Sequence, residues 1–158
     1  MSALATCRQH GLRMDSAITD STASAHRAAR KTLSEPCPMH LLYVEDDPII
    51  RELTTEVLQG AGLTVEAASC GVEACSAFSR AAAAGRPHAV VLLDLHLPDM
   101  NGWDVAKHVK VHPAGATVKV FLLTASAVAA AASPHAGVEI AGTILKPVTP
   151  KQLIDLLR

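Results

Sequence analysis

Short runs of apolar residues alternate along most of this chain with longer segments in which apolar residues recur at helical spacing. Runs short enough for strands occupy residues 41–44, 63–68, 89–93, 118–123 and 140–145. The periodic segments between them predict helices that begin near residues 48, 70, 103 and 151. Short apolar runs separated by helices are typical of a buried parallel sheet. Because parallel crossovers are right-handed, five such βα units predict a doubly wound α/β fold.

Local signals mark where several of these helices begin and end. Asp47 is a candidate N-cap, because the proline that follows it suits the first helical position. Thr149 precedes the last helix in the same way. The Ala-rich stretch 125–132 also favours a helix, which Pro134 should end early. In the last helix, three residues are expected to face inward: Leu153, Leu156 and Leu157.

Polar residues of different chemical kinds follow four of the five predicted strands. The acidic pair Asp46 and Asp47 follows the first strand, and Asp94 follows the third. Thr124 follows the fourth strand and Lys146 follows the fifth. In an open α/β sheet, ligands bind at the carboxyl ends of the strands. We therefore expect two acidic groups, a lone aspartate, a hydroxyl and an amine to meet at one edge of the sheet.

This set of side chains suits a divalent metal ion and a phosphoryl group. Three carboxylates close together repel one another unless a cation joins them, and Mg²⁺ is the usual oxygen-bound ion beside phosphate. Lys146 can neutralise a phosphoryl oxygen, and Thr124 can donate a hydrogen bond to another. Asp94 is then a candidate nucleophile that forms an aspartyl phosphate.

At these positions the chain resembles the receiver domains of two-component response regulators, over residues 40–158. The resemblance implies a flavodoxin-like fold: a doubly wound, five-stranded parallel sheet in the order 2-1-3-4-5, with helices on both faces. It is carried by four motifs: Val44-Glu45-Asp46-Asp47-Pro48, the loop from Asp94 to Gly102, Thr124-Ala125 and Lys146-Pro147.

The resemblance implies that Asp94 accepts a phosphoryl group from a phosphohistidine on a sensor histidine kinase or a histidine phosphotransfer protein. Mg²⁺ would be ligated by Asp47, Asp94 and the backbone carbonyl of His96, with Asp46 acting mainly through water. The downstream protein partner is not identified, and we expect a monomer or a weak dimer.

The same resemblance assigns the phosphoryl oxygens to Thr124 and Lys146, and it implies a cis peptide bond between Lys146 and Pro147. His96 and Ser126 occupy positions whose side chains tune dephosphorylation in the family. Thr143 stands where many receivers carry an aromatic switch residue, so aromatic switching is not expected in its usual form.

Two other functions compete with a phosphorylation switch. A phosphohydrolase that uses an aspartyl phosphate typically has a second aspartate two residues after the nucleophile, where this chain has His96. We therefore do not expect an enzyme. A receiver-like interaction module that is never phosphorylated is the other alternative, although the complete set of polar residues argues against it.

Composition narrows the remaining possibilities. At 158 residues and 49% hydrophobic content, the chain can form one ordinary domain, and its 3% aromatic content implies an aliphatic core. The formal net charge of −1 gives no sign of a nucleic-acid-binding surface. An uninterrupted apolar stretch of about 18 residues, as a membrane span requires, is absent from the sequence. We expect a cytoplasmic switch without an attached output domain.

Residues 1–38 differ from the rest of the chain, because they are rich in Ala, Ser, Thr and Arg and lack a sustained apolar period. We expect a disordered extension there, with the receiver domain over 39–158. Met39 directly precedes the first strand and is an alternative start site. The cysteines show no metal-binding spacing and are expected to be reduced and structural: Cys7, Cys37, Cys70 and Cys75.

His108 and His112 are four residues apart, a spacing that can bind zinc on a helix. Pro113 disfavours helical geometry at His112, so we interpret the pair as helix-end histidines.

Overall fold

The structure of the chain, a computed structural model, describes residues 39–126, 128 and 137–158. The expected extension over residues 1–38, with Cys7 and Cys37, lies outside the described residues. So does most of the expected helix over 125–132, together with Pro134.

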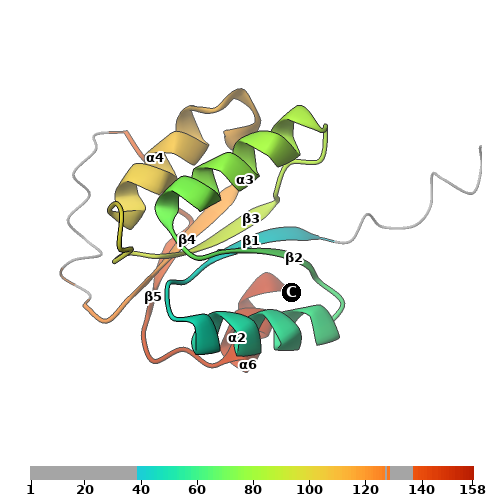
Figure 1. Cartoon of the computed structure of the whole chain (residues 1–158), viewed down its shortest axis with the longest axis vertical. Helices are drawn as coiled ribbons and strands as arrows, with labels where there is room; N and C mark the ends of the chain where they lie inside the picture. The colour runs from blue at the N-terminus through green and yellow to red at the C-terminus, as the bar shows by residue number, and fades with distance from the viewer. Residues whose placement is uncertain (1–38, 127, 129–136) are drawn as a thin grey trace, which may run out of the picture. The chain divides into compact units, whose positions relative to one another are not determined.

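Five parallel strands form one sheet in the order β2-β1-β3-β4-β5 (Figure 1), which confirms the predicted topology. Each strand lies within one or two residues of its expected position. The strands are β1 (His40–Val44), β2 (Thr64–Ala68), β3 (Val90–Asp94), β4 (Lys119–Thr124) and β5 (Gly142–Leu145).

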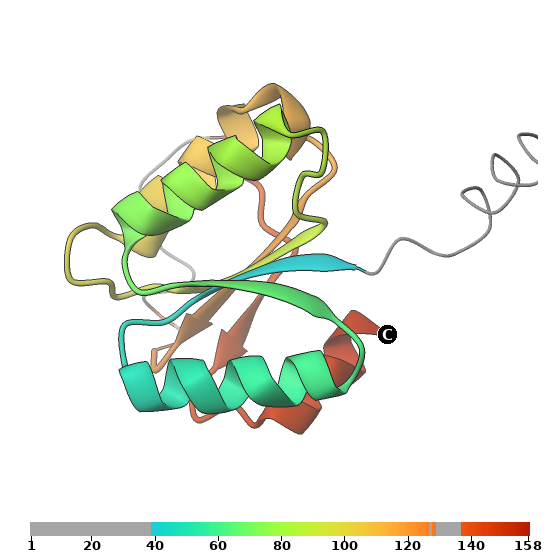
Figure 2. The same cartoon turned by 45° about the vertical axis from the view of Figure 1, so that its right-hand side comes forward.

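Helices cover both faces of the sheet, as Figures 1 and 2 show. On one face lie α2 (Pro48–Gly60) and α6 (Pro150–Leu157), and on the other lie α3 (Gly71–Ala83) and α4 (Gly102–Val111). A short 3₁₀ turn, η1 (Pro113–Gly115), follows α4. None of the helices in the described part of the chain is both long and apolar enough to cross a membrane.

Two of the three inner strands, β1 and β3, are apolar along nearly their whole length because helices cover both of their faces. Side chains of successive strand residues point to opposite faces, which divides the core into two clusters. Leu42, Val44, Val91 and Leu93 pack in the cluster with α3 and α4. Leu41, Tyr43, Val90 and Leu92 pack in the cluster with α2 and α6.

Side-chain caps begin the two helices on the α2 and α6 face as predicted. The Asp47 carboxylate accepts hydrogen bonds from the N–H groups of Ile49 and Ile50 at 2.8 and 3.0 Å. Thr149 forms a capping box with Gln152 at the start of α6. Both helices therefore start where the sequence signals place them.

The inward face of α6 differs from the expected one at a single position. Leu153 is buried and Leu157 is half-buried, as predicted, but Leu156 is 43% exposed. Ile154 is half-buried in its place. The reason is that α6 has only eight residues, so a small rotation decides which side of its apolar stripe meets the sheet.

Candidate functional site

Three carboxylates meet at the carboxyl edge of the central strands. Glu45 directly follows β1, Asp46 comes next, and Asp94 is the last residue of β3. One carboxylate oxygen from each of them lies within 4.8 Å of the others. Glu45 and Asp94 are only 2% and 6% exposed, while Asp46 is exposed to solvent. This acidic cluster is therefore buried on one side and open on the other.

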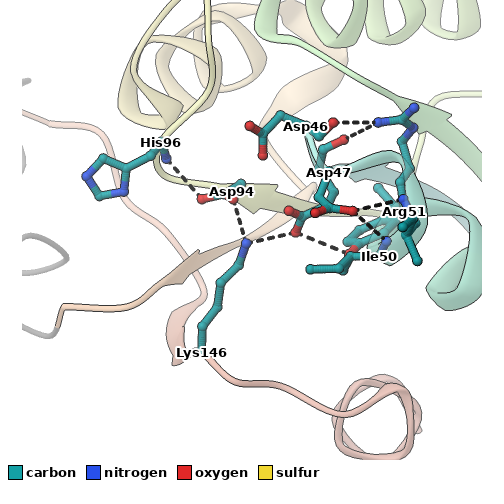
Figure 3. A network of polar contacts seen from close by, with 10 residues as sticks. Asp46, Asp47, Ile50, Arg51, Asp94, His96 and Lys146 are labelled. Atoms are coloured by element: carbon teal, nitrogen blue, oxygen red, sulfur yellow. Dashed lines mark hydrogen bonds and ion pairs between the residues drawn. The ribbon is translucent and has the colours of Figure 1, made fainter.

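Lys146, which follows β5, points into the acidic cluster (Figure 3). Its Nζ donates to Asp94 Oδ2 at 2.5 Å and to Glu45 Oε2 at 2.8 Å. Burial alone would lower the pKa of the Lys146 ammonium, but its bonds to Asp94 and Glu45 outweigh burial and raise that pKa. The Lys146–Pro147 peptide bond is cis, as predicted.

Glu45 is the least solvated member of the acidic cluster. Burial raises the pKa of its carboxyl above the ordinary value, and the charges of Asp94 and Asp46 act in the same direction, while Lys146 opposes them. The Tyr43 hydroxyl donates to Glu45 Oε2 at 3.4 Å, and burial raises the pKa of Tyr43 to about 12. One lysine thus faces three acidic groups, so this edge has an excess of negative charge.

Asp47 lies outside the acidic cluster, although we expected it there with Asp46 and Asp94. Its Oδ1 accepts two hydrogen bonds from the first turn of α2, which turns the carboxylate toward the helix. The carboxylates that lie close together are those of Glu45, Asp46 and Asp94, whereas the sequence interpretation grouped Asp46 and Asp47 with Asp94.

Arg51 binds the backbone of the segment that carries Glu45 and Asp46. The sequence analysis did not identify this residue. Its Nη1 donates to the carbonyl oxygens of Glu45 and Asp46 at 2.8 and 3.0 Å (Figure 3). The sequence contains a signal for this contact, because Arg51 lies one helical turn after the N-cap Asp47 and its side chain can reach back to the residues before the helix.

The loop after β3 brings the backbone close to Asp94. The N–H of His96 donates to Asp94 Oδ1 at 3.0 Å, while the imidazole ring points away from that carboxylate (Figure 3). The loop closes by an N–H to carbonyl bond from Gly102 to Leu95 at 2.8 Å. A Cβ on Gly102 would lie 2.5 Å from the Asp94 carbonyl oxygen, so only glycine allows this approach.

Thr124 is fully buried at the end of β4, and its hydroxyl bonds to its own loop. Oγ1 accepts from the Ser126 N–H at 3.1 Å and donates to the Ser126 carbonyl at 3.4 Å. Ser126 itself is exposed. Thr143 lies on the edge strand β5, opposite Leu122, and is exposed. The structure thus places Thr124 at the expected edge, with its hydroxyl oriented by Ser126.

His108 lies in α4 and His112 is its C-cap, and their ring nitrogens have separate protein partners. His108 Nε2 lies 3.1 Å from Ser79 Oγ, whereas His112 Nδ1 accepts from the Ala114 N–H. His112 ends the helix with an extended backbone, as the proline after it predicts. The two described cysteines, Cys70 and Cys75, are reduced and half-buried.

The donor set at the acidic cluster fits a hard divalent cation. All three groups offer carboxylate oxygen, which Mg²⁺ prefers, and they lie where water can complete its coordination. Glu45 and Asp94 are buried, and both form their ion pair with the same side chain, Lys146. A second positive charge would relieve the remaining repulsion.

Comparison with known proteins identifies a matching family. The family model of the response regulator receiver domain matches residues 41–158. The DNA-binding response regulator MtrA of Mycolicibacterium smegmatis is 34% identical over 120 residues, which cover 75% of this chain and 48% of that protein. The chain thus spans about half the length of the curated relatives that it matches first.

Solved structures agree with this family. The chemotaxis protein CheY4 of Vibrio cholerae aligns with a TM-score of 0.64 and 27% identity, covering 77% of this chain and 97% of that one. The response regulator TrrA of Thermotoga maritima, in complex with Mg²⁺-BeF, aligns with a TM-score of 0.60 and 27% identity over 75% of this chain and 95% of that one.

Proposed function

Because the chain belongs to the response regulator receiver domain family, we propose that it is a phosphoacceptor switch of a two-component phosphorelay, with Asp94 as the acceptor. The observation that carries this proposal is the meeting of three carboxylates and one amine at the carboxyl edge of the sheet. Lys146 bridges Asp94 and Glu45, and the other oxygen of Asp94 accepts from the His96 N–H, so the two oxygens of Asp94 have different partners.

The proposed metal is Mg²⁺, held by the carboxylates of Asp46 and Asp94 and by the backbone carbonyl of His96. Glu45 supports it from the buried side through water, the role that the sequence interpretation gave to Asp46, while Asp46 takes the place of Asp47 as a direct ligand. When bound, Mg²⁺ would draw phosphoryl oxygens to the site and offset their charge. A relative solved with Mg²⁺-BeF supports this choice of ion.

In the proposed transfer, an Asp94 carboxylate oxygen attacks the phosphorus of a phosphohistidine. The new oxygen–phosphorus bond forms as the nitrogen–phosphorus bond breaks, and the donor imidazole leaves with that electron pair. Lys146 already contacts Asp94 Oδ2, so its ammonium is in place to pair with a phosphoryl oxygen. Thr124 would turn its hydroxyl from the Ser126 carbonyl to another of these oxygens.

An apolar groove beside the acceptor supports a protein as the phosphoryl donor. It has a volume of about 580 Å³ and is lined by Ile50 and Leu53 of α2 and by Pro147 and Val148. Lys146 lines the same groove, so the apolar surface continues to the reacting group. We propose that a sensor histidine kinase or a histidine phosphotransfer protein docks there, in the cytoplasm.

A phosphohydrolase receives less support from the site. The residue two places after Asp94 is His96, whose ring points away from that carboxylate (Figure 3). His96 therefore does not provide the general acid or base that a phosphohydrolase needs beside its nucleophile. We propose a switch that is not an enzyme.

The proposal is tested by intact mass spectrometry of the full chain with acetyl phosphate and phosphoramidate, each with Mg²⁺ and with chelator. We expect one phosphate per chain that requires Mg²⁺ and is lost in Asp94→Asn. Asp155→Asn, an exposed carboxylate in α6, is the matched control and should behave like the wild type. A folded wild-type protein that gains no phosphate, or equal labelling of Asp94→Asn, would favour a phosphorylation-independent interaction module instead.

A further inference from the structure

A second group of ligating side chains lies at the amino end of the same strands. His40 is the first residue of β1, Glu66 lies within β2, and His88 stands two residues before β3. One ligand atom from each of them lies within 4.8 Å of the others. His88 precedes β3 and Asp94 ends it, so this histidine–glutamate cluster is at the opposite edge of the sheet from the acidic cluster.

The three side chains converge through their terminal atoms. His88 Nε2 lies 3.0 Å from Glu66 Oε2, and His40 Nε2 lies 3.9 Å from the same oxygen. The two imidazole rings stack with their centroids 4.1 Å apart, and both Nε2 atoms approach the same Glu66 oxygen. Two nitrogens and one oxygen from three neighbouring segments of the sheet therefore face a common point.

The contacts around His40 and Glu66 orient them as ligands. His40 Nδ1 lies 3.1 Å from the Arg86 carbonyl oxygen, which can only accept a hydrogen bond. Nδ1 must then carry the proton, so the lone pair of His40 is on Nε2 and faces the cluster. Arg80 pairs with Glu66 Oε1 and leaves Oε2 for the two histidines. Such outer hydrogen bonds commonly fix metal-binding side chains.

His88 is a buried imidazole with one ring nitrogen that makes no hydrogen bond to the described residues. Its side chain is fully buried, and its Nδ1 has no hydrogen-bond partner among the described residues. The Glu66 carboxylate can only accept a hydrogen bond, so His88 Nε2 donates to it in the metal-free chain. A metal ion bound at Nε2 would displace this proton, and Nδ1 is the nitrogen that can take it up. Phe78 stacks on the same ring and limits its rotation.

We propose that His40, Glu66 and His88 bind a divalent transition-metal ion of the Zn²⁺ class, with water at the remaining positions. Two imidazoles and one carboxylate are a ligand set that zinc accepts, whereas Mg²⁺ prefers an all-oxygen set like that of the acidic cluster. A solvent-open pocket of about 250 Å³, lined by His40, Glu66 and Arg80, gives water access to this point. The Arg80 side chain is 69% exposed, so solvent screens much of its opposing charge.

The test is calorimetric titration of the chelator-treated full chain with Zn²⁺. We expect one Zn²⁺ per chain at this site, and affinity at least about tenfold weaker in His40→Gln and in Glu66→Gln, because each loses a ligand. His108→Gln is the matched control, because His108 is also a half-buried histidine with a side-chain partner but lies outside the cluster. It should bind Zn²⁺ like the wild type. Circular dichroism of each variant confirms that it is folded.

Two further variants separate this site from other zinc ligands in the chain. Cys7→Ser with Cys37→Ser removes the thiols before residue 39, and Asp94→Asn alters the acidic cluster; we expect both to retain Zn²⁺ binding. Zinc affinity that is unchanged in His40→Gln and Glu66→Gln would overturn the proposal. Loss of binding in the double cysteine variant alone would do the same.

Discussion

Glu45 and Asp47 lie two residues apart, yet their carboxylates have different surroundings. The N–H of Glu45 still bonds to the Ala68 carbonyl at 3.1 Å, so the chain is extended there and the side chain enters the buried edge. Asp47 stands where the chain turns into α2, and its carboxylate caps that helix. The sequence predicts both a cap and a ligand at Asp47. In the structure its Oδ1 caps α2, and its carboxylate is not part of the acidic cluster.

Asparagine substitutions at the neighbouring aspartates therefore separate the two roles. Asp46→Asn should weaken Mg²⁺ binding by roughly tenfold or more, because it removes a carboxylate ligand from an open site. Asp47→Asn should leave Mg²⁺ affinity unchanged and cost little stability, because asparagine is an equally good N-cap. Both affinities can be measured from the amide NMR shifts of residues 45–47 and 94–96 during a Mg²⁺ titration. The opposite ranking of the two variants would restore Asp47 as the ligand.

At the scale of elements, the loop between β3 and α4 is tied to the start of α3. The Asp99 carboxylate accepts from the N–H groups of Gly71 and Val72, each at 2.8 Å. Cys70, the N-cap of α3, makes no side-chain capping bond of its own in the described structure. The sequence predicts the start of α3 correctly, but local patterns cannot reveal a cap that comes from 28 residues away.

This cap predicts an acid-dependent loss of stability. Burial opposes the effect, but the backbone bonds from Gly71 and Val72 outweigh it and lower the pKa of Asp99 below its ordinary 3.8. A carboxyl whose pKa is lower in the folded state stabilises the protein above its unfolded-state pKa, and loses this contribution as pH falls through its folded-state pKa. Asp99→Asn should therefore melt below the wild type at pH 6.

The melting-temperature difference between wild type and Asp99→Asn should then shrink as the pH falls below 3.8, where the wild-type carboxyl also becomes protonated. Thermal unfolding followed by circular dichroism between pH 6 and pH 2.5 measures it. Asp155→Asn, at an exposed i,i+4 pair in α6, serves as the control and should change little at any pH. A difference that stays constant with pH would show that the Asp99 charge does not stabilise α3.

Gly102 sets the path of the same loop. An added Cβ would lie 2.5 Å from the Asp94 carbonyl oxygen and 2.9 Å from Leu95 Cα, and neither backbone atom can move aside without disturbing the acceptor. We expect Gly102→Ala to lower the free energy of unfolding by about 1–3 kcal/mol. Gly60→Ala, at the end of α2, is the control, because an added Cβ there meets no described atom within 4 Å. Urea unfolding of both variants measures the difference, and equal stability would contradict the close approach.

At the scale of the whole molecule, apolar periodicity predicts the five strands and the doubly wound α/β fold correctly, and the resemblance to receiver domains predicts the strand order. Buried strands such as β3 can be recognised in the sequence as continuous apolar runs, because helices cover both of their faces. The same periodicity does not show which side of a helix meets the sheet. In α2, Thr54 and Leu58 are buried, whereas Ile50 and Leu53 are 47% and 57% exposed. An apolar stripe on a helix can serve either the core or a partner, and only packing distinguishes the two.

If that exposed stripe receives the phosphoryl donor, changing it should affect transfer between proteins but not the chemistry at Asp94. Leu53→Glu should slow transfer from a phosphorylated histidine kinase at least about tenfold, roughly 1.4 kcal/mol, while labelling by acetyl phosphate stays at the wild-type rate. Val72→Glu, which replaces a similarly exposed apolar residue of α3 on the other face, should change neither rate. Equal effects of the two variants on kinase transfer would place the docking surface elsewhere.

The central claim, that Asp94 is the phosphoacceptor, is tested most directly by locating the modified residue. Borohydride reduces an aspartyl phosphate to homoserine, which marks the acceptor permanently, and peptide mass spectrometry then identifies its position. After labelling with Mg²⁺ and a small phosphodonor, we expect homoserine at position 94, and none when Mg²⁺ is chelated. Homoserine in place of Asp46, Asp47 or Asp99, with Asp94 unchanged, would contradict the account.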